Sequence, residues 1–145
     1  MKTLTLLAII IVLAFPMGAL GVGVTWVPLK EGTEKARLEK KPMIVDFFYG
    51  KGCPRCELLD KNVYGDPVIA GKVMADFVPI RVDLTKPLAK EEVDLGNKFD
   101  YKNDCLLLFL TPEGEVFTDK AGKRLCFIDK VDPEWFVEYL DTIKE

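Results

Sequence analysis

The sequence contains no histidine among its 145 residues. This absence excludes Ser-His-Asp and Cys-His catalysis, zinc sites that need histidine, and an imidazole acting as a base near neutral pH. The sequence also lacks an excess of positive charge, because 20 Lys and Arg residues stand against 23 Asp and Glu residues and the formal net charge is -3. A broad nucleic-acid surface is therefore not expected. Chemistry must rest on thiols, carboxylates, amines or a bound cofactor.

Charge is missing altogether from the first part of the chain, where no charged side chain occurs between Lys2 and Lys30. The short cationic start leads into an apolar run at residues 4–15, and Pro16 interrupts that run before several small residues. This pattern is typical of a secretory signal peptide.

The uncharged start sets the domain boundary. We assign residues 1–23 to a signal peptide and residues 24–145 to one folded domain. An uncleaved membrane anchor through residues 4–27 is the alternative, because the uncharged stretch is long enough to span a bilayer. In either case the domain is expected in the periplasm or otherwise outside the cytoplasm, where disulfides form and persist.

The exported part alternates strand-like and helix-like segments, which predicts one α/β domain with a central mixed β-sheet flanked by helices. Strands are expected at residues 25–29, 43–49, 77–82, 106–110, 115–118 and 124–128. Helices are expected at residues 31–41 and 90–99, and after Cys53, Pro67 and Pro133.

Three of these elements carry more detailed expectations. The segment at residues 77–82 reads as a second central strand, although Pro79 predicts a free edge or a bulge there. The helix after Pro67 is expected to place on one side Val68, Ile69, Val73 and Met74. The last helix is expected to face inward with Phe136, Leu140 and Ile143.

The candidate chemistry lies in the run Cys53-Pro54-Arg55-Cys56, which follows a glycine-containing turn and begins a predicted helix. Two thiols three positions apart can form a small-loop disulfide, and the helix N-terminus favours a thiolate at Cys53. Lys51 and Arg55 add cationic charge that acts in the same direction. Cys56, one turn further in, is expected to be more buried and less acidic. An exposed attacking thiol beside a resolving thiol is what disulfide exchange needs.

Each of these assignments has an alternative. Asp46, on the preceding strand, accepts a proton from Cys56 if it is buried beneath the cysteines; otherwise it is a solvated or salt-bridged carboxylate at a strand end. The cysteine pair could be an ordinary structural disulfide or half of a metal site. A four-cysteine zinc site normally has a second CxxC, and the sequence has none.

Several runs of the sequence together resemble the thioredoxin superfamily. The resemblance is closest to the C-terminal periplasmic domains of DsbD-type transmembrane thiol:disulfide interchange proteins and to similar exported thioredoxin-like proteins. It rests on residues 42–47, 53–56, 62–67, 77–83, 108–114 and 132–140. The resemblance implies a thioredoxin-like fold, with Cys53 as attacking thiol, Cys56 as resolving thiol and Asp46 as buried acid.

Three positions depart from the family pattern. The loop between Asp46 and Cys53 is one residue longer than usual, and Gly52 stands where a Trp is common. Cys105 occupies the position of the family's cis-proline. Since a cis bond before a non-proline residue costs roughly 3 kcal/mol, the Asp104–Cys105 peptide is expected to be trans.

Cys105 would bring a third sulfur close to the cysteine pair, and three interpretations of it stay open. In the first, Asp104 and Cys105 position the substrate and Cys105 acts as a third redox thiol. In the second, Cys53, Cys56 and Cys105 bind copper, zinc or an iron–sulfur centre, with Cys126 as a further ligand. In the third, Cys105 and Cys126 form a structural disulfide or Cys105 is buried and inert.

The sequence thus predicts an exported thiol:disulfide oxidoreductase that needs no cofactor. Its expected partners are the thiols and disulfides of exported proteins and a membrane electron donor, and it is expected to be a monomer that binds no nucleic acid. The alternatives are a thiolate metal-binding or delivery protein on the same fold and a redox-inactive interaction domain.

Overall fold

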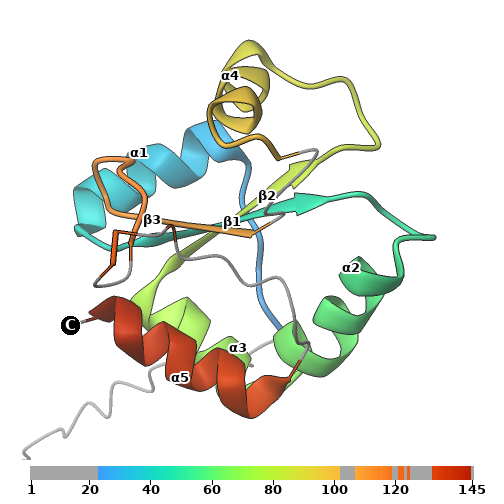
Figure 1. Cartoon of the computed structure of the whole chain (residues 1–145), viewed down its shortest axis with the longest axis vertical. Helices are drawn as coiled ribbons and strands as arrows, with labels where there is room; N and C mark the ends of the chain where they lie inside the picture. The colour runs from blue at the N-terminus through green and yellow to red at the C-terminus, as the bar shows by residue number, and fades with distance from the viewer. Residues whose placement is uncertain (1–22, 102–106, 119–120, 123, 125–131, 145) are drawn as a thin grey trace, which may run out of the picture.

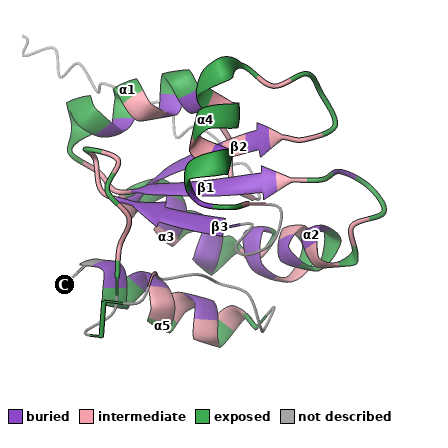
Figure 2. Cartoon of the chain, turned by 45° about the horizontal axis from the view of Figure 1, so that its top comes forward, coloured by how far each residue is buried: buried purple, intermediate pink, exposed green. Residues whose placement is uncertain are grey.

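The computed structural model describes residues 23–101, 107–118, 121–122, 124 and 132–144. A three-stranded sheet of order β2-β1-β3 lies between two layers of helices (Figure 1). Helices α1 and α4 cover one face of this sheet, and α2, α3 and α5 lie on the other side (Figure 2). The predicted α/β class with a mixed central sheet is confirmed.

The central strand β1 (Met43–Phe48) pairs in parallel with β2 (Val78–Asp83) and antiparallel with β3 (Leu107–Leu110). Its side chains alternate between two hydrophobic clusters, as the period of a strand requires. Val45 and Phe47 pack in the cluster with α1, whereas Ile44 packs in the cluster with α3 and α5. Asp46 therefore points to the side of α2.

Strand β2 lies at the edge of the described sheet, so the prediction that it is central is wrong. Pro79 correctly predicts an edge position, but the edge is not free there, because Val27 pairs with its outer side. The Val78 N–H donates to Pro42 on the side of β1, whereas the Pro79 carbonyl accepts from Val27 on the outer side. Because a residue's N–H and C=O point the same way in a strand, the N–H that Pro79 lacks costs no bond to β1.

The first strand predicted from sequence is reduced to a single bridge. Val27 pairs with Ile80, and α1 (Leu29–Glu39) begins two residues later, after Pro28. The predicted strand at residues 115–118 likewise makes only isolated bridges, from Val116 to Leu110 and from Thr118 to Arg124. Of the strand predicted at residues 124–128, all but Arg124 lies outside the described residues.

The remaining helices largely follow the predicted boundaries. They are α2 (Pro54–Leu58), the π-helical η1 (Leu59–Tyr64), α3 (Pro67–Asp76), α4 (Lys90–Lys98) and α5 (Pro133–Lys144). The Asp66 carboxylate accepts hydrogen bonds from the Val68 and Ile69 N–H groups at the start of α3. The predicted inward face of α5 is confirmed, since Phe136, Leu140 and Ile143 are buried.

The predicted inner face of α3 is only half right. Ile69 and Val73 are buried, but Val68 is 72% exposed and Met74 is 38% exposed. A short helix against a sheet buries a stripe narrower than the four apolar residues suggest.

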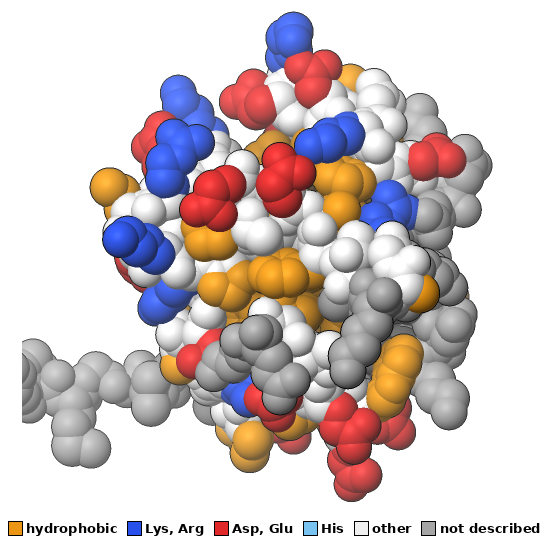
Figure 3. Space-filling model, turned by 60° about the vertical axis from the view of Figure 1, so that its left-hand side comes forward, with side chains coloured by type: hydrophobic (Ala, Val, Ile, Leu, Met, Phe, Trp, Pro, Cys, Tyr) orange, Lys and Arg blue, Asp and Glu red, His pale blue; other side chains and the backbone are white. Residues whose placement is uncertain are grey.

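The described side chains on the face drawn in Figure 3 carry charges of both signs around a strip of hydrophobic residues.

Candidate active site

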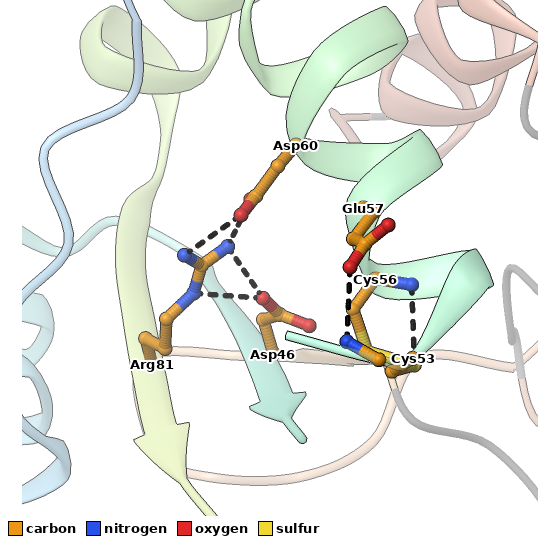
Figure 4. Close-up of a disulfide and its surroundings, with 7 residues drawn as sticks. Asp46, Cys53, Cys56, Glu57, Asp60 and Arg81 are labelled. Carbon is orange, nitrogen blue, oxygen red and sulfur yellow. Dashed lines mark hydrogen bonds and ion pairs between the residues drawn. A yellow bond between two sulfur atoms is a disulfide. The ribbon is translucent and has the colours of Figure 1, made fainter. Parts of the chain in front are cut away.

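Cys53 and Cys56 form a disulfide at the start of α2, with their Cα atoms 5.3 Å apart (Figure 4). Cys53 is the extended residue that precedes the helix, and Pro54 occupies the first helical position. The Cys56 N–H donates to the Cys53 sulfur over 3.3 Å. Cys56 is buried, with 5% of its surface exposed, whereas Cys53 is only partly buried. The exposure of the two sulfur-bearing residues thus differs in the direction that the sequence predicts.

The turn before Cys53 has an unusual backbone. Gly50 and Gly52 have φ values of 80° and 93°, in the region that favours glycine. A bulky side chain such as Trp would be strained at position 52, which accounts for glycine there. The turn is tied to α2, because the Gly52 N–H donates to the Glu57 carboxylate over 2.9 Å.

Asp46 lies between Arg81 and the disulfide, and one of its carboxylate oxygens faces Arg81 (Figure 4). Asp46 is 4% exposed, and its Oδ2 accepts from the Arg81 Nε over 2.9 Å. The sequence left two alternatives for Asp46, a buried acid or a solvated or salt-bridged carboxylate. The structure combines parts of both, because Asp46 is buried and also salt-bridged.

Arg81 is held by two carboxylates and two aromatic rings. It reaches from β2 to Asp46, and to Asp60 on η1 at 2.5 Å. Its guanidinium carbon lies 4.3 Å from the ring centroids of both Trp26 and Phe48. Burial alone would lower the pKa of Arg81, but the hydrogen bonds and charges of Asp60 and Asp46 outweigh burial and raise it. Arg81 is therefore a fixed positive charge, separated from the disulfide by Asp46 (Figure 4).

Two opposing influences set the protonation of Asp46. Burial raises the pKa of Asp46 from 3.8 to about 6, although the charge and hydrogen bonds of Arg81 act to lower it. A carboxyl group with a pKa of about 6 is mostly ionised at neutral pH and able to take up a proton there.

Sequence reasoning missed Arg81, Asp60 and Glu57. Arg81 carried a usable signal, since it is the only basic residue of β2 and interrupts the apolar run at residues 78–82. Asp60 and Glu57 carried none, because their partners are known only once the helix is placed against the sheet and the turn.

Other residues predicted for the site are placed less fully. Lys51 is exposed in the turn, and Arg55 is partly buried on α2, where its charge contributes to lowering the pKa of Asp46. Their stabilisation of a Cys53 thiolate stays a prediction. Asp104, Cys105 and Cys126 lie outside the described residues, as does nearly all of the signal segment. In the described part of the chain, no group of three or more Cys, Asp or Glu residues is arranged to hold a metal ion.

A thioredoxin-like family model matches residues 25–112, which include the cysteine pair, Asp46 and Arg81. The chain belongs to the thioredoxin-like family. The predicted thioredoxin-like fold is therefore confirmed. Membership of this family and the CxxC-spaced pair together support thiol:disulfide oxidoreductase activity.

Solved structures agree with this thioredoxin-like assignment. A thioredoxin from Thermus thermophilus has a TM-score of 0.62 at 21% identity, over 84% of this chain and 88% of its own. A DsbH oxidoreductase has a TM-score of 0.60 at 15% identity, over 83% and 84%. The reduced DsbD C-terminal domain of Neisseria meningitidis has a TM-score of 0.55 at 21% identity, over 79% and 92%. At these identities the likeness establishes the fold.

No curated protein matches this thioredoxin-like chain. Among the helices formed by the described residues, none has both the length and the apolar character needed to cross a membrane.

Proposed function

We propose that the protein is an exported thiol:disulfide oxidoreductase that reduces or exchanges disulfides in other exported proteins. The observation that carries this proposal is the Cys53–Cys56 disulfide at the start of α2, beside the buried carboxylate of Asp46. The thioredoxin-like family supports the same chemistry.

In the first step, the reduced protein attacks through Cys53. The thiolate of Cys53 forms a bond to one sulfur of the substrate disulfide, and the other substrate sulfur leaves as a thiolate. The start of α2, together with the cationic side chains of Lys51 and Arg55, favours the charged form of Cys53. The greater exposure of Cys53 relative to Cys56 supports its role as the attacking thiol.

In the second step, Cys56 resolves the mixed disulfide. Its sulfur bonds to the Cys53 sulfur, the mixed disulfide breaks, and the second substrate thiolate leaves. The proton of Cys56 passes to Asp46 and then to a departing thiolate or to water. Two electrons have then moved from the protein dithiol to the substrate, and the protein holds the disulfide seen in the structure.

Repeated turnover needs a two-electron donor outside the cytoplasm. A dithiol of a membrane partner fits this requirement, because the oxidised pair accepts electrons by the same exchange chemistry. The uncharged N-terminal segment supports an exported or membrane-anchored location.

The other two cysteines are assigned separately. We propose that Cys105 either joins the exchange as a third thiol beside Asp104 or is bonded to Cys126. Mass mapping of the native disulfides distinguishes these arrangements, since only the second gives a linked peptide pair containing Cys105 and Cys126.

The function is tested by reduction of insulin disulfides with dithiothreitol as electron donor. We expect the protein to accelerate insulin precipitation, Cys53→Ser to abolish the acceleration, and Cys56→Ser to accumulate a mixed disulfide detectable by mass spectrometry. A rate equal to that of dithiothreitol alone, unchanged by Cys53→Ser, would sink the proposal and favour a redox-inactive interaction domain.

A further inference from the structure

Glu57 contacts the backbone on both sides of Cys53. Its carboxylate accepts from the Gly52 N–H over 2.9 Å, and its own N–H donates to the Cys53 carbonyl over 3.0 Å. Figure 4 shows the carboxylate reaching back across the first turn of α2 to the residue before the disulfide. The Glu57 side chain thus links the turn to α2, whereas the bond to the Cys53 carbonyl comes from the backbone and does not depend on the side chain.

Within the turn at residues 50–52, Gly50 is buried against Thr85, whereas Gly52 is exposed. Both glycines have positive φ values, and a Cβ placed on Gly52 would meet nothing within 4 Å. Packing therefore does not hold Gly52, and glycine has more backbone freedom than any other residue. The hydrogen bond from its N–H to Glu57 restrains the backbone immediately before the attacking sulfur.

The Glu57 carboxylate is also negatively charged, and a negative charge disfavours a nearby thiolate. It is bound to the residue adjacent to Cys53, so its field opposes that of the start of α2 and of Lys51 and Arg55. The Glu57 side chain thus combines a positioning contact with a negative charge, and the two effects can be separated by substitution.

We propose that Glu57 is a positioning residue for Cys53, which fixes the Gly52 backbone and restrains the acidity of the Cys53 thiol. This inference rests on the proposed role of Cys53 as the attacking thiol. It assigns to the residue after the cysteine pair a part in setting the reactivity of that pair.

The test uses Glu57→Gln, which can still accept from the Gly52 N–H, and Glu57→Ala, which cannot. Glu34→Gln, on the exposed surface of α1, is the matched control for the loss of one negative charge. Two properties are measured in each protein: hydrogen exchange of the Gly52 amide in the oxidised form, and the pH profile of Cys53 alkylation in the reduced form, resolved by peptide mass.

We expect Glu57→Gln to alkylate at Cys53 roughly threefold faster below the thiol pKa, since removing a charge several ångströms away changes the thiolate fraction by about that factor. Its Gly52 exchange should match that of the natural protein. Glu57→Ala should show both faster alkylation and Gly52 exchange accelerated about tenfold or more, and Glu34→Gln should show neither change.

The inference is overturned if Glu57→Gln leaves the alkylation profile unchanged, or if Glu57→Ala leaves Gly52 exchange unchanged. Neither measurement requires catalytic turnover. Failure of insulin reduction in the natural protein would therefore remove the proposed function without removing the effect of Glu57, and an unchanged profile beside active insulin reduction would remove only the role of Glu57.

Discussion

Asp46 gives the folded protein a pH dependence of unusual sign for a carboxylate. Its pKa is raised from 3.8 to about 6 by burial, which outweighs the opposing charge of Arg81. Between these two values the folded state holds a proton that the unfolded state has released. The stabilisation from this group is therefore complete below pH 3.8 and is lost as the pH rises through 6.

We expect the wild-type protein to lose about 2 kcal/mol of unfolding free energy between pH 4 and pH 7 relative to the Asp46→Asn variant. The variant cannot titrate at this position, so comparing the two proteins cancels the contributions of all other groups. Urea unfolding at a series of pH values measures the difference. Parallel stability curves for the two proteins would show that Asp46 has a normal pKa in the folded state.

At the scale of single residues, the sequence predicts the cysteine pair and the candidate acid but not the groups that hold that acid. Arg81 lies 35 residues from Asp46 and 21 residues from Asp60 along the chain. The spacing of residues along the chain does not reveal such pairs, because they form only after β2 is placed beside β1 and Asp60 of η1 is brought within reach of Arg81. Only the chemical type of Arg81, a charge in an apolar run, hinted at a buried partner.

At the scale of elements, two glycines in helices have very different surroundings. Gly32 in α1 faces β2, and a Cβ there would approach the Ile80 side chain to less than 3.0 Å. Gly71 in α3 is exposed, and a Cβ there would meet nothing within 4 Å. The first glycine is required by the close approach of helix and sheet, whereas the second only lowers helix propensity.

Substitution of these glycines by alanine should therefore have effects of opposite sign. We expect Gly32→Ala to lower the unfolding free energy by about 1–3 kcal/mol through overpacking against Ile80. We expect Gly71→Ala to raise it by about 0.5–1 kcal/mol through helix propensity. Urea unfolding of both variants measures these changes, and equal gains in the two proteins would contradict the close contact between α1 and β2.

The elements best predicted from sequence are those whose ends carry their own signals. Asp66 with Pro67 marks the start of α3, and β1 is marked by a run that is apolar except for Asp46. Sheet order is a property of the whole fold, so the sequence could not place β2 at an edge except through Pro79. The widened turns of η1 were also missed, because no local residue pattern distinguishes a π-helical segment from an α-helix.

At the scale of the whole molecule, the two redox forms are expected to differ in stability. The Cys53–Cys56 bond closes a loop with a sequence separation of only 3. Chain-entropy arguments for so short a loop give a stabilisation of about 2 kcal/mol. A reduced form stabilised by a thiolate would oppose this, and Glu57 acts against such a thiolate.

We therefore expect the oxidised protein to unfold at a higher urea concentration than the reduced protein. The corresponding difference in unfolding free energy is about 2 kcal/mol. The variant Cys53→Ser/Cys56→Ser, measured with and without reductant, corrects for any contribution of Cys105 and Cys126. A reduced form more stable than the oxidised one would instead mark the pair as a strong oxidant of partner thiols.

The pairing of Val27 with β2 affects the tendency of the protein to aggregate at high concentration. An unprotected edge strand is a template on which another chain can add a strand and begin to aggregate. On the outer side of β2, Val27 already occupies the Pro79 carbonyl and the Arg81 N–H, and Pro79 offers no donor at all. Strand addition along this stretch of β2 would have to displace Val27 first. The segment before α1 thus hinders the edge-to-edge pairing of β2 with a strand of another molecule.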